Sequence, residues 1–82
     1  MLTKKNWSTR DLQEAAYLKF RGIPINLELI NSLVVFTAPL SDELYRLITA
    51  YNMDDAVPVM TYSAAIRALK AQMFALKEAH RG

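Results

Sequence analysis

Residues 61–81 read TYSAAIRALKAQMFALKEAHR, a segment without Gly or Pro that is rich in Ala, Leu, Met, Lys, Gln and Arg. These side chains lose the least conformational freedom in a helix, so the segment predicts a helix of about five turns. Thr61 is placed to be its N-cap, and Gly82 stands where a glycine commonly ends a helix. We expect the rest of the chain to cover one side of this closing helix.

The closing helix has three different faces when each residue advances by about 100°. The expected core face carries apolar residues at helical spacing: Tyr62, Ala65, Ile66, Leu69, Met73 and Leu76. A basic face surrounds one aromatic ring with positive charge: Arg67, Lys70, Phe74, Lys77 and Arg81. An alanine face is a row of small residues: Ala64, Ala68, Ala71, Ala75 and Ala79.

The basic face and the alanine face each have two open interpretations. The basic face is either a solvated surface or a nucleic-acid contact, in which Lys and Arg meet phosphates and Phe74 stacks on a base. The alanine face either reflects helix propensity alone or lets a helix of another subunit come close. The sequence thus predicts possible nucleic-acid contacts and possible oligomer contacts on the same helix.

The N-terminal half of the chain predicts a helix and a hairpin. The helix is expected over residues 10–21, with Ser8 or Thr9 as N-cap and Gly22 as the stop. Residues 23–30 and 33–38 then alternate as strands do, with a two-residue turn between them. The expected register pairs Leu29 with Val34, Leu27 with Phe36 and Ile25 with Ala38 on the apolar face, and Glu28 with Val35 and Asn26 with Thr37 on the solvated face.

A middle helix is expected after Pro39, with Ser41 as N-cap and acidic residues in its first turn. Its buried stripe is Leu44, Leu47, Ile48 and Tyr51. A lone hairpin is only marginally stable in water, and the three helices supply the layer that it needs. The sequence therefore predicts a small two-layer α+β domain in the order α-β-β-α-α, with an antiparallel hairpin packed against three helices.

Length and composition limit the class of protein. The 82 residues make a single domain, residues 1–82, in which we expect residues 1–6 to be a frayed lead-in. Hydrophobic residues make up 52% of the chain and charged residues only 22%, which is more apolar than is usual for a small monomer. We therefore expect association with another protein or with a second copy, most simply a homo-oligomer. The net charge of +2 is too small to indicate nucleic-acid binding by itself.

Patterns typical of catalysis or of a cofactor are not found in the sequence. It has no Cys, one His at position 80, and too few glycines for a phosphate loop. The adjacent carboxylates Asp42 and Glu43, and Asp54 and Asp55, fit a helix dipole and a solvated loop better than an acid–base couple. We expect no enzymatic activity, no cofactor and no metal site. No apolar run could span a bilayer and no secretory signal is recognised, so we expect a cytoplasmic protein without membrane contact.

Several short motifs together resemble a known family. They are Thr9-Arg10-Asp11-Leu12, then Ala15-Ala16-x-Leu18 and Gly22, Val34-Val35-Phe36, the segment 44–51, and Ala68-Leu69-Lys70. This set resembles a family of short bacterial and phage-associated domains of unknown function, over residues 8–76. The resemblance implies the same α-β-β-α-α order and a setting in bacteria or mobile elements, and it supplies no catalytic residue.

Three functions follow as hypotheses. The first is a small non-enzymatic module for protein interaction or self-association, indicated by the apolar composition and the alanine face. The second is a nucleic-acid-binding accessory protein that uses the basic face. The third is a phage or mobile-element inhibitor of a host system, which rests on the family resemblance.

Overall fold

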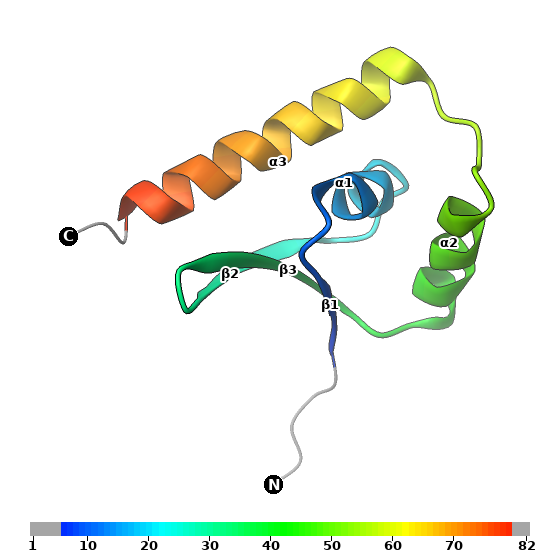
Figure 1. The fold of residues 1–82 in the computed structure, drawn as a ribbon. Coiled ribbons are helices and arrows are strands. Elements are labelled where there is room, and N and C mark those ends of the chain that lie inside the picture. Colours follow the sequence, from blue (N-terminus) through cyan, green and yellow to red (C-terminus); the bar gives the residue numbers. More distant parts are fainter. Residues whose placement is uncertain (1–5, 80–82) are drawn as a thin grey trace, which may run out of the picture.

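A computed structural model describes residues 6–79 of the chain. Its elements are β1 (Asn6–Thr9), α1 (Leu12–Phe20), β2 (Asn26–Ile30), β3 (Leu33–Pro39), α2 (Asp42–Asn52) and α3 (Val59–Ala79). Figure 1 shows a sheet below and a helical layer above it, with α1 between the sheet and α3. The predicted α+β class and its helix–hairpin–helix–helix order are confirmed.

The hairpin has the predicted register wherever its two strands pair. Leu27 lies opposite Phe36, and Leu29 lies opposite Val34. Asn31 and Ser32 have φ angles of 51° and 70°, the left-handed conformation of a two-residue turn whose twist suits a hairpin. The turn and the alternation of apolar residues therefore select the same register.

The strand β1 was not predicted, and one predicted hairpin pair does not form. β1 is antiparallel to β3, so the strand order is β1-β3-β2 and Ala38 lies opposite Trp7. β3 is consequently the central strand. The predicted pair of Ile25 with Ala38 is absent because β2 begins only at Asn26. Thr37, expected on a solvated face, is only 8% exposed because it lies between Ser8 of β1 and Asn26 of β2.

Two helix starts also differ from the prediction. The N-cap of α1 is Asp11, whose side chain accepts hydrogen bonds from the backbone N–H groups of Gln13 and Glu14, whereas Ser8 and Thr9 belong to β1. α3 begins at Val59, so Thr61 lies inside the helix and is not its cap. Ser41 caps α2 as predicted, accepting a hydrogen bond from the backbone N–H of Leu44 at 3.0 Å.

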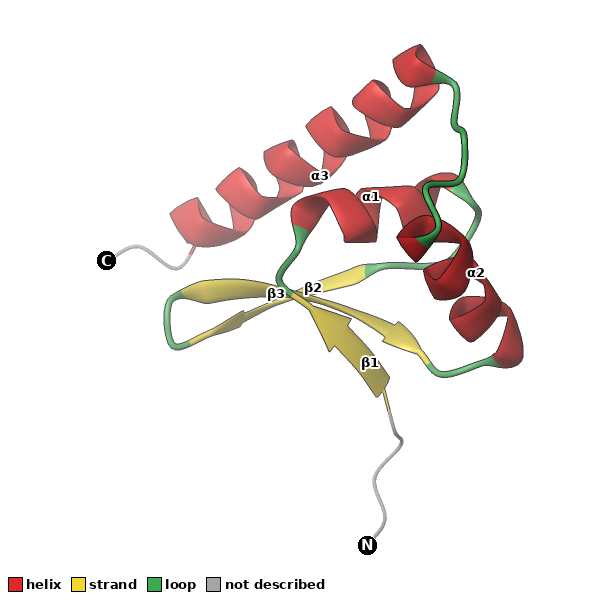
Figure 2. Cartoon of the chain, turned by 45° about the vertical axis from the view of Figure 1, so that its right-hand side comes forward, coloured by secondary structure: helices red, strands yellow, loops and turns green. Residues whose placement is uncertain are grey.

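The interior consists of two adjoining apolar clusters. The first joins the sheet to α1 and α3, with Phe36 and Leu69 fully buried. The second joins α1 to α2, with Leu18 and Leu44 fully buried and Trp7 of β1 packed against it. Figure 2 shows the consequence: α1 and α3 lie on one side of the sheet, α2 flanks α1, and the other side of the sheet has no covering layer among the described residues.

Candidate functional site

The helix α3 is held in a defined rotation by its contacts with α1 and the sheet. The predicted core face is confirmed: Leu69 is fully buried, and Tyr62, Ala65, Ile66, Met73 and Leu76 pack against the first apolar cluster. The Tyr62 hydroxyl donates a hydrogen bond to the Gln13 carbonyl oxygen at 2.8 Å. The remaining faces of α3 are therefore turned away from the interior.

The basic face is exposed over its described residues. Arg67, Lys70 and Lys77 are exposed, and the Phe74 side chain is 71% exposed. Arg81, the fifth residue predicted for this face, lies outside the described residues, as do His80 and Gly82. Phe74 is therefore not packed on a neighbouring element.

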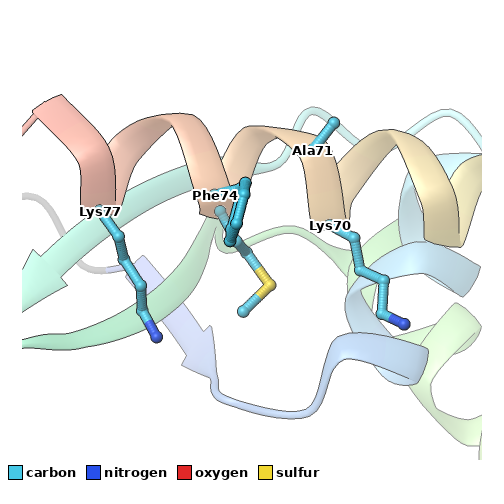
Figure 3. A pocket seen from close by; sticks show the side chains of 5 residues that line it. Lys70, Ala71, Phe74 and Lys77 are labelled. Carbon is cyan, nitrogen blue, oxygen red and sulfur yellow. The ribbon is translucent and has the colours of Figure 1, made fainter.

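A hollow of about 440 Å³ brings part of the basic face together. It is lined by Lys70, Ala71, Met73, Phe74 and Lys77, all of them from α3. Figure 3 shows the side chains of Lys70, Phe74 and Lys77 extending to the same side of the helix. The hollow thus has an apolar lining between two ammonium groups, and Arg67 does not line it.

The alanine face is exposed along its whole length. All five residues of this face are exposed: Ala64, Ala68, Ala71, Ala75 and Ala79. Their spacing of three and four residues places them on one stripe of the helix, and Met60, which is 80% exposed, lies one turn before Ala64. Such a stripe lets another backbone approach closely.

A second cavity, of about 470 Å³, was not anticipated from the sequence. Tyr17 of α1, Tyr51 of α2 and Tyr62 of α3 line it together with Asp54 and Asp55 from the loop before α3. The rings of Tyr17 and Tyr51 are 5.3 Å apart between centroids. These residues are up to 45 positions apart in the chain, so no local pattern could have revealed the cavity.

An ion pair and two hydrogen bonds join two of the lining residues, Tyr17 and Asp55, to each other and to Arg21. The Tyr17 hydroxyl donates to Asp55 Oδ2 at 2.6 Å, Arg21 forms an ion pair with the same oxygen, and Arg21 Nε donates to the Tyr17 oxygen at 3.3 Å. The hydrogen bond from Tyr17, and then that from Arg21, lowers the pKa of Asp55. Burial, and then the hydrogen bond to Asp55, raises the pKa of Tyr17.

Comparison with known families identifies a family to which the chain is similar. The model of a family described as a domain of unknown function, DUF5659, matches residues 4–75. The chain belongs to this family. No curated protein and no solved structure matches the DUF5659 chain.

The match covers the elements from β1 to α2 completely and all of α3 except its last turn. The resemblance to a family of small domains of unknown function, drawn from the motifs of residues 8–76, is thereby confirmed. Lys70 and Phe74 lie inside the matched range, and Lys77 lies just beyond it. The family description names no activity that could be assigned to these residues.

Within its described residues, 6–79, the DUF5659 domain has two surface features of different chemistry. One is the exposed part of α3, apolar with a basic border; the other is the tyrosine-lined cavity. The same range holds no group of three or more His, Cys, Asp or Glu residues that could bind a metal ion. No helix in the described range is long and apolar enough to cross a membrane.

Proposed function

We propose that the DUF5659 domain is a non-enzymatic protein-interaction module that docks through the exposed part of α3, with a second copy of the chain as its first partner. The observation that carries this proposal is Phe74, a large aromatic side chain left 71% exposed beside an apolar hollow. Exposed apolar surface with a polar border is typical of sites that bind another protein.

The alanine face explains how a second helix could reach Phe74. Helices pack at about 8–10 Å between their axes, and the short distances require small side chains at the contact. Ala68 and Ala71 are such residues, and Ala71 also lines the hollow beside Phe74. A partner helix lying along the alanines would therefore border the hollow at Ala71, within reach of the exposed ring.

The charges beside the hollow indicate which partner surface fits. Lys70 and Lys77 flank Phe74 (Figure 3), so carboxylates at the border of the partner surface would complement them. In a second copy, the described carboxylates on α3 are limited to Glu78. Self-association through this one helix is consequently expected to be weak, because a single helix pair buries less area than the roughly 1,200 Å² of a stable interface.

Sedimentation velocity over a range of concentrations tests the proposal. The wild-type domain is expected to sediment faster as its concentration rises through tens of micromolar. Ala68→Glu combined with Ala75→Glu places two buried charges in the proposed contact, so this variant is expected to remain monomeric with an unchanged circular dichroism spectrum.

The matched control adds the same two charges elsewhere. Thr49 and Asn52 are exposed on α2, so Thr49→Glu combined with Asn52→Glu is expected to associate as the wild type does. A wild-type chain that stays monomeric at every concentration and binds no protein would overturn the proposal. If all three proteins associate equally, the contact between copies lies outside the alanine face of α3.

One observation favours nucleic-acid binding as a second candidate. Phe74 is an exposed ring between two lysines, the combination that stacks on a base while neutralising phosphates. Lys70→Glu with Lys77→Glu is then expected to abolish binding to single-stranded DNA or RNA, and wild-type affinity is expected to fall steeply with salt. Absence of binding at low salt would remove this candidate. Inhibition of a host system stays a prediction, and it would itself require docking on a host protein.

A further inference from the structure

The tyrosine-lined cavity lies apart from the exposed face of α3 and has a different chemistry. It is formed where α1, the end of α2 and the start of α3 meet, and α1 lies between the other two helices (Figures 1 and 2). Three of its lining residues are aromatic: Tyr17, Tyr51 and Tyr62. A ring presents a negative face, which attracts a cation placed over it.

The charged residues that line the cavity are both acidic. Asp55 is already engaged by Tyr17 and Arg21. Asp54 is exposed, and its carboxylate forms no ion pair with any described residue. Its backbone is in the left-handed conformation, with φ of 65°, and its N–H donates to the Tyr51 carbonyl at 3.1 Å. Asp54 is therefore held next to Tyr51 by the turn that ends α2.

Two more carboxylates act on the cavity from the start of α1. Burial raises the pKa of the Tyr51 hydroxyl, and the charges of Asp11 and Glu14 raise it further. Asp11 also raises the pKa of Tyr62, after the larger effect of burial. The phenols of Tyr51 and Tyr62 thus remain neutral at physiological pH.

The domain itself shows which cation fits such surroundings. The guanidinium carbon of Arg21 lies 5.5 Å from the centre of the Tyr17 ring while Arg21 is paired with Asp55. Two lining residues of the cavity, Tyr17 and Asp55, therefore already hold a guanidinium group by a ring and a carboxylate. Tyr51 and Asp54 line the same cavity and provide the same two features, and among the described residues Asp54 forms no ion pair and Tyr51 no cation–π contact.

We propose that the tyrosine-lined cavity binds a guanidinium group against Tyr51 and Asp54, supplied by an arginine side chain of a partner or by a small guanidinium compound. A guanidinium group is planar and weakly hydrated, so it stacks on an aromatic ring more readily than an ammonium group does. Its N–H fork also matches a carboxylate. This binding is independent of docking through α3.

Titration with small probes, followed by ¹H–¹⁵N NMR, tests this site. N-acetyl-arginine amide is expected to shift the backbone signals of Tyr51, Asp54 and Tyr62, and the uncharged analogue N-acetyl-citrulline amide is expected to leave them unchanged. Ethylguanidinium distinguishes the two sources. If it binds as tightly as N-acetyl-arginine amide, the ligand is a small guanidinium compound; if it binds more weakly, the ligand is an arginine within a peptide. The proposed guanidinium site would be wrong if the citrulline analogue caused shifts of equal size, or if neither guanidinium probe caused a shift.

A charge-removing variant locates the binding in the cavity. Asp54→Asn keeps a residue that tolerates a positive φ and is expected to weaken binding of N-acetyl-arginine amide about threefold to fivefold, the effect of one exposed ion pair. Glu28→Gln removes a charge from an exposed position on β2 and is expected to bind as the wild type does. Tyr51→Leu, checked for folding by its amide spectrum, is expected to weaken binding further. Unchanged affinity in both Asp54→Asn and Tyr51→Leu would refute the assignment.

Discussion

Asp55 connects the loop before α3 to α1. It accepts hydrogen bonds from Tyr17, 38 positions earlier in the chain, and from Arg21 at the end of α1. The Tyr17 ring is buried against Tyr51 of α2, so this small network joins three segments at one point. Its contribution to folding depends on Asp55 being ionised.

The first prediction concerns acid stability. Because the hydrogen bonds from Tyr17 and Arg21 lower the pKa of Asp55 in the folded state, Asp55 stabilises the fold fully above its unfolded pKa of about 3.9. That stability is lost as the pH falls through the lower, folded pKa. Asp55→Asn is therefore expected to lower the melting temperature by several degrees at pH 7, and the difference from wild type is expected to shrink below pH 4.

Thermal melts between pH 2 and pH 7 check this prediction. Asp42→Asn is the control, since Asp42 is exposed in the first turn of α2 and forms no ion pair with a described residue. A melting-temperature difference for Asp55→Asn that is constant across the pH range would show that its carboxylate is not the cause.

The second prediction concerns the turn of the hairpin. Ser32 has a φ of 70°, where a residue with a Cβ atom is strained and glycine is not. Ser32→Gly is expected to stabilise the domain by about 0.5 kcal/mol, because relief of roughly 1 kcal/mol of strain is partly offset by the greater freedom of glycine when unfolded. Urea unfolding measures the change. A loss of stability would indicate that the Ser32 side chain itself contributes.

At the scale of elements, α3 is attached along one face only. Leu69 is fully buried at the middle of that face, while Ala68 beside it is exposed. Leu69→Ala is expected to destabilise the domain by about 2–5 kcal/mol, the usual cost of a cavity in a core. Ala68→Ser is expected to change stability by less than about 0.5 kcal/mol. Urea denaturation of both variants checks the orientation of α3, and similar losses in both would contradict it.

The elements that the sequence predicts well are those with a repeated signal. The hairpin register was predictable because Leu27, Leu29, Val34 and Phe36 agree on one face and a two-residue turn joins them. The faces of α3 were predictable because 21 residues repeat the helical spacing almost without interruption. In both cases many side chains support one arrangement.

The features that the sequence does not reveal depend on single or distant residues. β1 has only four residues, mostly polar, and its pairing with β3 joins Trp7 to Ala38 across the length of α1 and the hairpin. The start of α3 at Val59 was missed because Thr61 is a good capping residue, although Tyr62 N–H bonds to the Pro58 carbonyl instead. The tyrosine-lined cavity needs three helices to be in place before its residues meet.

At the scale of the whole molecule, the domain is a thin slab of 41 × 38 × 16 Å with two unlike surfaces. The uncovered side of the sheet carries exposed polar residues such as Ser8, Asn26 and Glu28, with the half-exposed Ile30 and Leu33 at the hairpin end. α3 lies on the opposite side of the domain (Figure 2), and it carries the exposed alanines and Phe74. Polar and charged side chains on the edge strands β1 and β2 discourage strand pairing between copies, so association is expected through the helical side.

The last prediction follows from this asymmetry. If copies associate through α3, folding is coupled to assembly, and the folded state gains RT ln(1 + [L]/Kd) as the protein concentration rises. A concentration ten times the dissociation constant then adds about 1.4 kcal/mol, which corresponds to roughly 6–11 °C in the melting temperature of a domain this small. The wild type is therefore expected to melt at higher temperature as it is concentrated, whereas Ala68→Glu with Ala75→Glu is expected to melt at the same temperature throughout. A rise of equal size in both proteins would place the contact on another surface, because only the exposed stripe of α3 differs between them.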